Sequence, residues 1–330
     1  MTFSEFTAMH DINPTIEELI GRCDLYRRRG EYDRGYDCSR RFIEIAASDS
    51  VDGEVRCRAL TEASRFAYYA SRFDESVSLL DRVQAMLRGL GGETVYRIEL
   101  EARLIRANVL RRLGEYDKAL RLLDDGKDPW PTALEAERLL IEGACLYYQS
   151  EFLVAQEKLE SSLGLAAYMK DDMLRARVLT MNGLLQQRIG FLRSAEEYLL
   201  RAWELCRTGT DHYGEAAAAL NLGIVQYRQG RFAEARESIE RARSIFRQVG
   251  WTIGVCRAIL AHGNVEKYAR ELGKAVRHYR KAARIAAAHD FIREQALAEE
   301  FIGEVCTARG EYELAGEHFE RGLELAGRIG

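Results

Sequence analysis

Apolar residues recur along most of the chain at intervals of three, four and seven positions, a spacing that places them on one face of an α-helix. One such position recurs late in successive segments of similar length: Leu80, Leu123, Leu159, Leu199, Ile239, Tyr279 and Phe319. In the last four segments a small residue follows three positions later: Ala202, Ala242, Ala282 and Gly322. The pattern predicts a series of amphipathic helices, and therefore an all-α fold.

A short motif separates the helices within each segment. It consists of Gly or Ser, any residue, an aromatic residue or Leu, two further residues, and a small residue. The motif begins at eight positions: Gly30, Ser71, Gly114, Ser150, Gly190, Gly230, Arg270 and Gly310. Only the occurrence at 270 has Arg in place of Gly or Ser. The spacings are 41, 43 and 36 residues and then four times 40. A glycine in the left-handed conformation ends a helix at little cost, so the motif predicts a tight turn between two antiparallel helices.

A second small residue stands seven positions before each motif: Cys23, Ser64, Ala107, Gly143, Gly183, Gly223, Gly263 and Gly303. Small side chains on both helices let the backbones approach closely, and the aromatic residue of the motif fills the space beside the crossing. Asn13 and Pro14 predict the start of the first helix. After an extension of residues 1–14 we expect one domain, 15–330, with eight repeats: 15–50, 54–90, 93–128, 132–170, 172–208, 212–250, 251–289 and 291–330.

These repeats resemble the tetratricopeptide repeat family. The residues that carry the resemblance most clearly are Asn221, Leu222, Gly223, Tyr227, Gly230, Phe232, Ala235 and Ala242. It covers about residues 15–330 and weakens in the first two repeats, where Arg22 and Ser39 stand at sites that are apolar in the family. The period is near 40 instead of the usual 34, as in kinesin light chains and the sensor arms of bacterial transcriptional regulators, and implies helices longer by most of a turn. HEAT and armadillo repeats share the period, but their Pro and Asp/Arg signatures are missing here. The resemblance implies a right-handed α-solenoid superhelix whose first helices line the concave wall.

Composition fits a helical protein that remains in the cytoplasm. The chain is 47% hydrophobic and 30% charged with only 3 Pro, and its net charge of -4 gives no overall field that attracts nucleic acid or a membrane. The 7 cysteines form no CxxC pair and lie within helical patterns, so we expect reduced thiols. No apolar run reaches the length of a membrane span, and the N-terminus lacks the features of a secretory signal.

The sequence offers no clear catalytic or metal site. The glycine-rich stretch at 89–92 lacks the Lys-Ser/Thr of a phosphate-binding loop. His278 and His318 lie one repeat apart without ligand partners at matching positions, which favours a slot on the outer face over a metal site. No Ser/His/Asp or Cys/His set can be assembled, so we expect no cofactor, no metal and no enzymatic activity.

The candidate binding surface is the concave face of the first helices. Residues there that lie outside the packing columns combine guanidinium, amide and phenol groups: Arg65, Tyr68, Asn108, Arg111, Arg112, Tyr147, Tyr148, Arg188, Asn221, Tyr227, Arg228 and Asn264. Such groups hold a carboxylate or an extended backbone by charge-assisted hydrogen bonds, although the same residues also serve simply to solubilise helix ends.

Two functions remain open at this stage. The first is a scaffold whose concave face binds a protein or a peptide, acidic or carboxylate-bearing. The alternative is a sensor arm of a larger signalling or transcriptional regulator. Leu297, Phe301 and Phe319 in the last repeat would leave apolar surface without a capping helix. We therefore expect either a longer native chain or self-association through this end.

Overall fold

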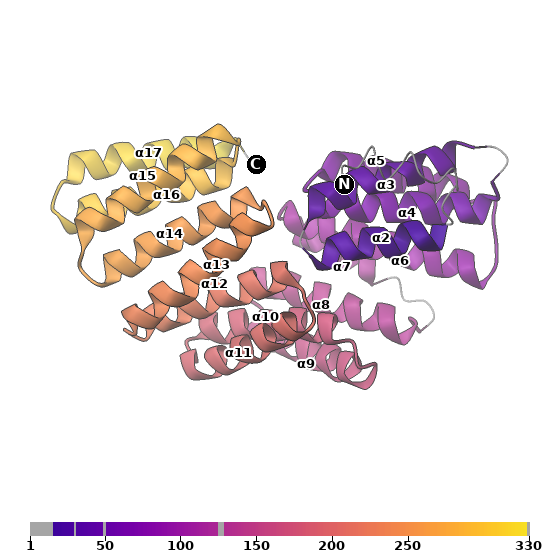
Figure 1. Ribbon diagram of the computed structural model, residues 1–330, viewed down its shortest axis with the longest axis horizontal. Coiled ribbons are helices and arrows are strands. Elements are labelled where there is room, and N and C mark those ends of the chain that lie inside the picture. Colours follow the sequence, from indigo (N-terminus) through magenta and orange to yellow (C-terminus); the bar gives the residue numbers. More distant parts are fainter. Residues whose placement is uncertain (1–15, 30, 49–50, 125–128, 329–330) are drawn as a thin grey trace. The chain divides into compact units, whose positions relative to one another are not determined.

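The computed structural model describes residues 16–29, 31–48, 51–124 and 129–328. Within these ranges the chain forms 16 α-helices and no strand, which confirms the predicted all-α class (Figure 1). Within residues 16–148 and within residues 152–327, each helix packs antiparallel against the next one along the chain, as in a helical solenoid. Asn13 and Pro14, the predicted helix start, lie outside the described residues. No described helix is both long enough and apolar enough to cross a membrane.

The chain divides into two compact units, of which the first spans residues 1–149. Its helices are α2 (Ile16–Arg28), α3 (Tyr32–Ala47), α4 (Gly53–Tyr69), α5 (Phe73–Leu87), α6 (Glu93–Arg112), α7 (Tyr116–Leu123) and α8 (Thr132–Tyr148). We call even-numbered helices first helices and odd-numbered helices second helices, after their order in each predicted repeat.

The second unit spans residues 150–330. Its helices are α9 (Phe152–Tyr168), α10 (Asp172–Ile189), α11 (Leu192–Thr208), α12 (His212–Arg228), α13 (Phe232–Gln248), α14 (Thr252–Tyr268), α15 (Leu272–Ala288), α16 (Ile292–Ala308) and α17 (Tyr312–Gly327). The boundary between the units falls between α8 and α9, inside the predicted repeat 132–170. A single domain of eight repeats therefore stays a prediction.

The turns within the helix pairs have the predicted left-handed conformation. Four of the motif glycines have φ between 79° and 106°: Gly114, Gly190, Gly230 and Gly310. Three other residues adopt the same conformation at the motif start, with φ from 61° to 67°: Ser71, Ser150 and Arg270. After Gly230, the Arg231 N–H donates to the Gln226 carbonyl at 2.9 Å. Of the two hydrogen bonds that close a Schellman motif, this is the one that spans more residues.

Helix α7 is an exception to the expected helix length. It has 8 residues, whereas the other second helices have 15 to 17. The sequence after it, 124–131, contains consecutive Asp residues, a Gly and two Pro, and proline cannot continue a helix. The short helix also accounts for the spacing of 36 residues between the third and fourth motifs.

Close crossings of small residues hold each helix pair together. A Cβ atom added to Gly223 would lie 2.5 Å from Ile239 Cγ1 and 3.1 Å from the Ala235 carbonyl oxygen. At Gly263 the added atom would lie 2.3 Å from the ring of Tyr279. In the first unit, the Ser64 and Ser76 hydroxyls lie 2.9 Å apart at the equivalent crossing, and each also donates to the other residue's carbonyl. The backbones are therefore too close for a larger side chain.

The last repeat leaves part of its apolar surface open. Phe319 is 37% exposed and Leu323 on the same helix is 72% exposed. Leu297 and Phe301, which the sequence also placed there, are partly buried against the core of the second unit. The exposed apolar surface thus lies on α17 and not on α16.

Replacing Gly223 by Ala should lower the free energy of unfolding by about 1 to 3 kcal/mol, because the added methyl overpacks the α12–α13 crossing. The matched control is Gly164→Ala on α9, where an added Cβ meets no atom within 4 Å. There the better helix propensity of alanine should raise stability by about 0.5 to 1 kcal/mol. Chemical denaturation of both variants checks this, and a destabilisation shared equally by the two would contradict the close-crossing account.

Candidate functional site

All the predicted binding residues lie on first helices, and from α4 onward successive first helices contact one another within each unit. In the first unit α4 contacts α6 and α6 contacts α8. In the second unit α10, α12, α14 and α16 form a continuous row. Each unit therefore has its own first-helix face, and we describe the two faces separately.

On the first unit, Arg111 connects two neighbouring first helices. Its Nη2 donates to Asn108 Oδ1 at 3.2 Å on the same helix and to the Tyr68 hydroxyl at 3.4 Å on α4. Its Nε is buried and has no hydrogen-bond partner among the described residues. The structure thus brings three predicted residues together, and they bind mainly to each other.

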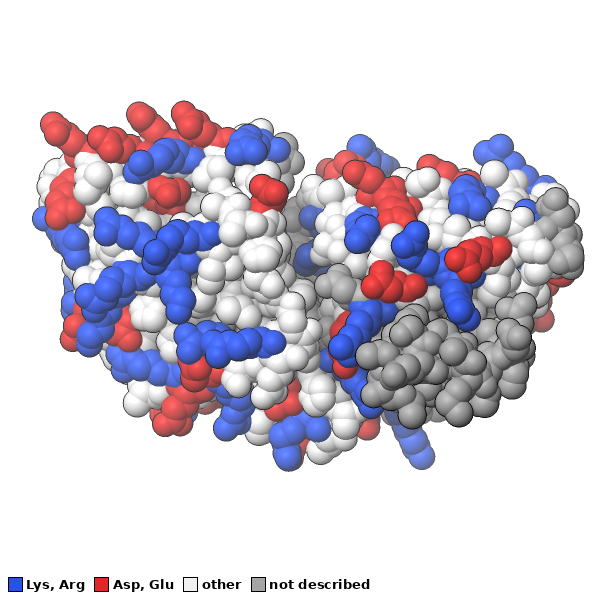
Figure 2. Space-filling view, turned by 45° about the horizontal axis from the view of Figure 1, so that its top comes forward, with Lys and Arg blue, Asp and Glu red and all other residues white. Residues whose placement is uncertain are grey.

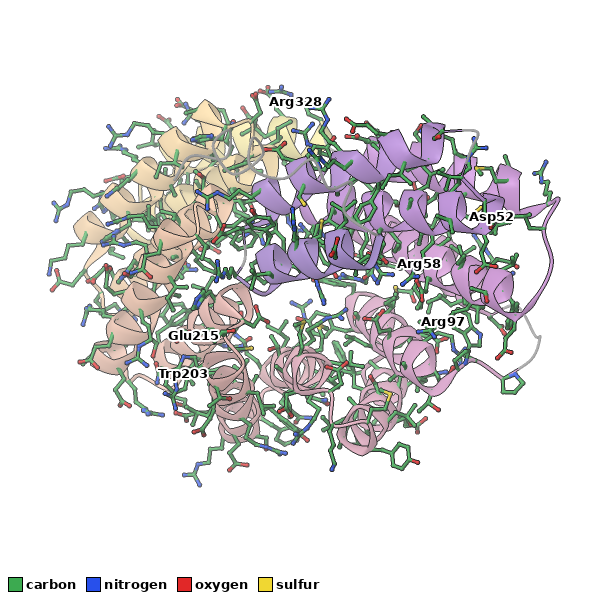
Figure 3. All side chains as sticks on the ribbon, turned by 45° about the vertical axis from the view of Figure 1, so that its right-hand side comes forward. Asp52, Arg58, Arg97, Trp203, Glu215 and Arg328 are labelled. Atoms are coloured by element: carbon green, nitrogen blue, oxygen red, sulfur yellow. The ribbon has the colours of Figure 1, made fainter. Side chains whose placement is uncertain are left out.

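Arg65 on the same face is held by carboxylates. Its Nη2 lies 3.4 Å from Glu62 and 3.2 Å from Glu101, and its side chain is 24% exposed. Glu101 also contacts Arg97, labelled in Figure 3, with Nε at 3.2 Å. Because these carboxylates already balance its charge, Arg65 offers little attraction to an acidic ligand.

The aromatic residues of the first unit form contacts among themselves. The ring of Tyr148 stacks on that of Tyr116 with centroids 5.2 Å apart, and Tyr147 meets Tyr148 edge-on at 5.0 Å. The exposed Arg112 guanidinium lies 5.9 Å from the centre of the Phe73 ring. The two tyrosines and Arg112 remain partly accessible, but as packed groups.

On the second unit, two arginines lie at equivalent positions of adjacent first helices. Arg188 at the end of α10 is exposed and has no hydrogen-bond or ion-pair partner among the described residues. Arg228 at the end of α12 is also exposed, and its Nη1 donates to the Gln187 carbonyl at 3.0 Å. Asn221, two turns before Arg228 on the same side of α12, is partly buried and likewise has no described partner. Neither guanidinium is paired with a carboxylate in the described part of the chain.

Tyr227 differs from the sequence-based expectation. The sequence placed it outside the packing positions, yet it is only 8% exposed and packs in the core with Ile239 and Val265. Burial raises the pKa of its hydroxyl to about 12, and a hydrogen bond joins it to Asn264. Asn264 Oδ1 also accepts a hydrogen bond from Tyr279 at 2.8 Å. Tyr227 therefore belongs to the core beneath the face and not to its accessible surface.

Neighbouring carboxylates partly neutralise the positive charge on this face. Arg257 on α14 pairs with the buried Glu294 on α16 at 2.7 Å, and Lys267 pairs with Glu304 in the same way. Tyr268, an aromatic residue that the sequence also places on this face, has its ring 5.0 Å from Tyr227 and is 52% exposed. It stands 40 residues after Arg228, at the equivalent position of the next first helix.

Comparison with known proteins agrees with this architecture. A sequence model described as tetratricopeptide repeat matches residues 174–248, and a second model of the same description matches 100–125. Among curated proteins, no sequence matches the chain significantly. With the helix pairs and their small-residue crossings, the two matches support the predicted tetratricopeptide repeats.

Solved structures share the fold over most of the chain. A Rap protein complexed with Competence and Sporulation Factor is 14% identical, with a TM-score of 0.67 over 94% of this chain and 97% of that one. The Rap conjugation gene regulator of the plasmid pLS20, in complex with the Phr* peptide, is 13% identical, with a TM-score of 0.67 over 83% and 74%. Aspartyl phosphate phosphatase F from Bacillus subtilis is 11% identical, with a TM-score of 0.56 over 96% of both chains. At such identities the likeness concerns the fold alone.

Three histidines of the second unit, His262, His278 and His318, lie at packed positions. His278 stacks on His262 with centroids 5.6 Å apart, and His318 is buried with Nδ1 2.7 Å from Glu299. No group of three potential ligands that could hold a metal occurs among the described residues. Burial lowers the pKa of both His262 and His278, and the second imidazole lowers that of His262 further. Carboxylates oppose this shift: Glu240 on α13, 3.5 Å from His262, and Glu266, which acts on His278.

The histidine pair should make the second unit less stable in acid. Because the folded pKa values lie below those of the unfolded chain, the unfolded state binds more protons, and stability falls as pH drops through about 6.5. Replacing His278 by Gln should therefore reduce the loss of Tm between about pH 7.5 and 5.5. His289→Gln is the matched control, since His289 is exposed. Equal losses of Tm in both variants and the original protein would rule out this role of the pair.

Proposed function

We propose that the chain is a non-catalytic scaffold whose first-helix face on the second unit binds an extended peptide that carries a carboxylate. The observation that carries the proposal is the pair Arg188 and Arg228, both exposed and neither paired with a carboxylate in the described ranges. They project from equivalent positions of α10 and α12, which contact each other. Two guanidinium groups so placed can share one carboxylate by charge-assisted hydrogen bonds.

Neighbouring groups suit the rest of such a peptide. The half-buried amide of Asn221 offers both a donor and an acceptor, which is what an extended backbone requires. Tyr268 adds an exposed aromatic surface on the next first helix. By contrast, the arginines Arg65 and Arg111 of the first unit already have partners within the chain, so a ligand there would first have to displace them.

The similar structures support a peptide ligand and favour one alternative. One of them holds the Phr* peptide, so the same fold accommodates a peptide in another protein. That protein is a conjugation gene regulator. The second candidate function is accordingly a regulatory arm whose ligand changes the activity of an attached or associated protein.

Replacing both Arg188 and Arg228 by Glu tests the scaffold proposal. With a pool of short peptides that end in a free carboxylate, we expect the double variant to bind at least about tenfold more weakly, because each charge-assisted hydrogen bond contributes well over 1 kcal/mol. The same peptides with an amidated C-terminus should bind the original protein about as weakly as the free-carboxylate peptides bind the double variant. Fluorescence anisotropy measures both effects.

The control reverses the same charge elsewhere. Arg193 and Arg201 are exposed residues of α11, a second helix of the same unit, and have no described partner. Arg193→Glu with Arg201→Glu should leave peptide affinity within about twofold of the original at moderate salt, because distant exposed charges are screened. If the two double variants bound the peptides equally well, the recognition surface would not be the first-helix face.

A further inference from the structure

One second helix of the second unit reverses a charge pattern that its neighbours share. At the position seven residues after each motif start, the second helices of this unit carry Glu157, Glu197, Glu237, Arg277 and Glu317. Three residues later they carry Glu160, Leu200, Glu240, Arg280 and Glu320. Glutamate thus predominates in the register, and α15 alone among these five helices replaces it with arginine at both positions.

The reversal makes α15 a basic stripe. The helix has five basic residues and no Asp or Glu, and all five are exposed: Lys274, Arg277, Arg280, Lys281 and Arg284. Only Lys274 has an ion pair in the described part of the chain, with Glu271 at 3.5 Å. In Figure 2, basic side chains gather on the second unit below a row of acidic side chains.

Helix α17 carries the opposite charge. Its exposed glutamates follow one another at intervals of four, three and four residues, which keeps them on one helix face: Glu313, Glu317, Glu320 and Glu324. None of them forms an ion pair with a described residue. The only Lys or Arg within α17, Arg321, is turned to Glu299 at 3.3 Å. Both stripes are therefore exposed, and apart from Lys274 their charges have no ion-pair partner among the described residues.

The two stripes occupy equivalent positions along their helices. Each of Arg277, Arg280 and Arg284 precedes a glutamate of α17 by 40 residues, one repeat. Helices α15 and α17 run in the same direction, because α16 lies between them and packs antiparallel to each. Consider a two-fold axis that is parallel to the two helices and lies in front of their exposed sides, at equal distance from both. Rotation about this axis would place the basic stripe of one copy over the acidic stripe of the other.

We propose that a second copy of this chain docks on the α15 and α17 face through this two-fold arrangement. The contact is isologous, so each residue pair occurs twice, as in most homodimers. Leu323 borders the acidic stripe and is 72% exposed, which adds apolar area to the contact. The charged stripes set the register, and this apolar side chain is removed from water.

A broad polyanion fits this face less well. A nucleic-acid duplex or an anionic membrane would extend beyond one helix and meet the four exposed glutamates of α17. Like charges brought together in this way oppose binding. A partner with alternating stripes of both signs is favoured, and this chain itself presents one.

The dimer should depend strongly on salt, since its pairs are solvent-accessible and individually weak. We expect association at about 50 mM salt and loss of at least about tenfold in affinity at about 500 mM, where the screening length falls below the separation of most pairs. Sedimentation velocity of the full chain measures the oligomeric state in both conditions.

A charge swap provides the sharper test. One variant carries Arg277→Glu, Arg280→Glu and Arg284→Glu, so both of its stripes are acidic, and the other carries Glu317→Arg, Glu320→Arg and Glu324→Arg, so both are basic. Each variant alone should be monomeric, whereas an equimolar mixture should form a mixed dimer. Circular dichroism confirms that both variants remain helical. The control Arg193→Glu with Arg201→Glu should dimerise like the original protein.

Two results would overturn the proposal. One is an original protein that stays monomeric at about 50 mM salt up to about 100 µM, a concentration that would detect even weak pairing. The other is a mixture of the two folded variants that contains no mixed dimer. The first-helix face takes no part in this contact, so either result would leave the peptide-binding proposal standing.

Discussion

The close crossing of small residues within each helix pair is the interaction on which the rest of this structure depends. At Gly183, Gly223 and Gly263 there is no room for even one additional carbon atom, because the opposing side chain already occupies the space. This contact fixes the distance and the angle between the two helices of a pair. Repetition of the same contact then stacks the pairs in the same way along each unit.

This stacking separates two kinds of surface. First helices line up against one another on one face, and second helices present their outer sides to solvent on another. A residue's place in the repeat therefore decides which surface it belongs to. Arg188 and Arg228 recur on the first-helix face, while Arg277 and Glu317 recur on the outer sides of second helices. Two separate binding functions can thus be carried by one repeat without competing for the same residues.

The two units use similar side chains differently. In the first unit, Arg65 and Arg111 satisfy their donors with carboxylate, amide and phenol groups of the chain, which stiffens the face. In the second unit, Arg188 and Arg228 keep their guanidinium groups open to solvent. An exposed arginine that has no carboxylate within reach is available to a ligand, because binding does not require an existing ion pair to be broken.

Periodicity in the sequence by itself determined the helix pairs, the turns and the crossings. The turn motif, from its first occurrence at Gly30 to its last at Gly310, recurs at nearly constant intervals because every repeat must satisfy the same backbone geometry. The repeat pattern can therefore be read from the residue types alone. The sequence also placed Arg188 and Arg228 on first helices, and in the structure they lie on α10 and α12. The sequence misjudged Tyr227, whose large ring could lie outward or inward, and its burial in the core is decided by the packing around Val265 and Ile239.

The ion pairs between repeats also depend on the tertiary structure. Arg65 and Lys267 look free in the sequence, but glutamates from neighbouring helices compensate their charges. Such pairs join residues 36 and 37 positions apart, and only the tertiary structure decides which charges meet, because the angle between adjacent repeats sets which side chains come within reach.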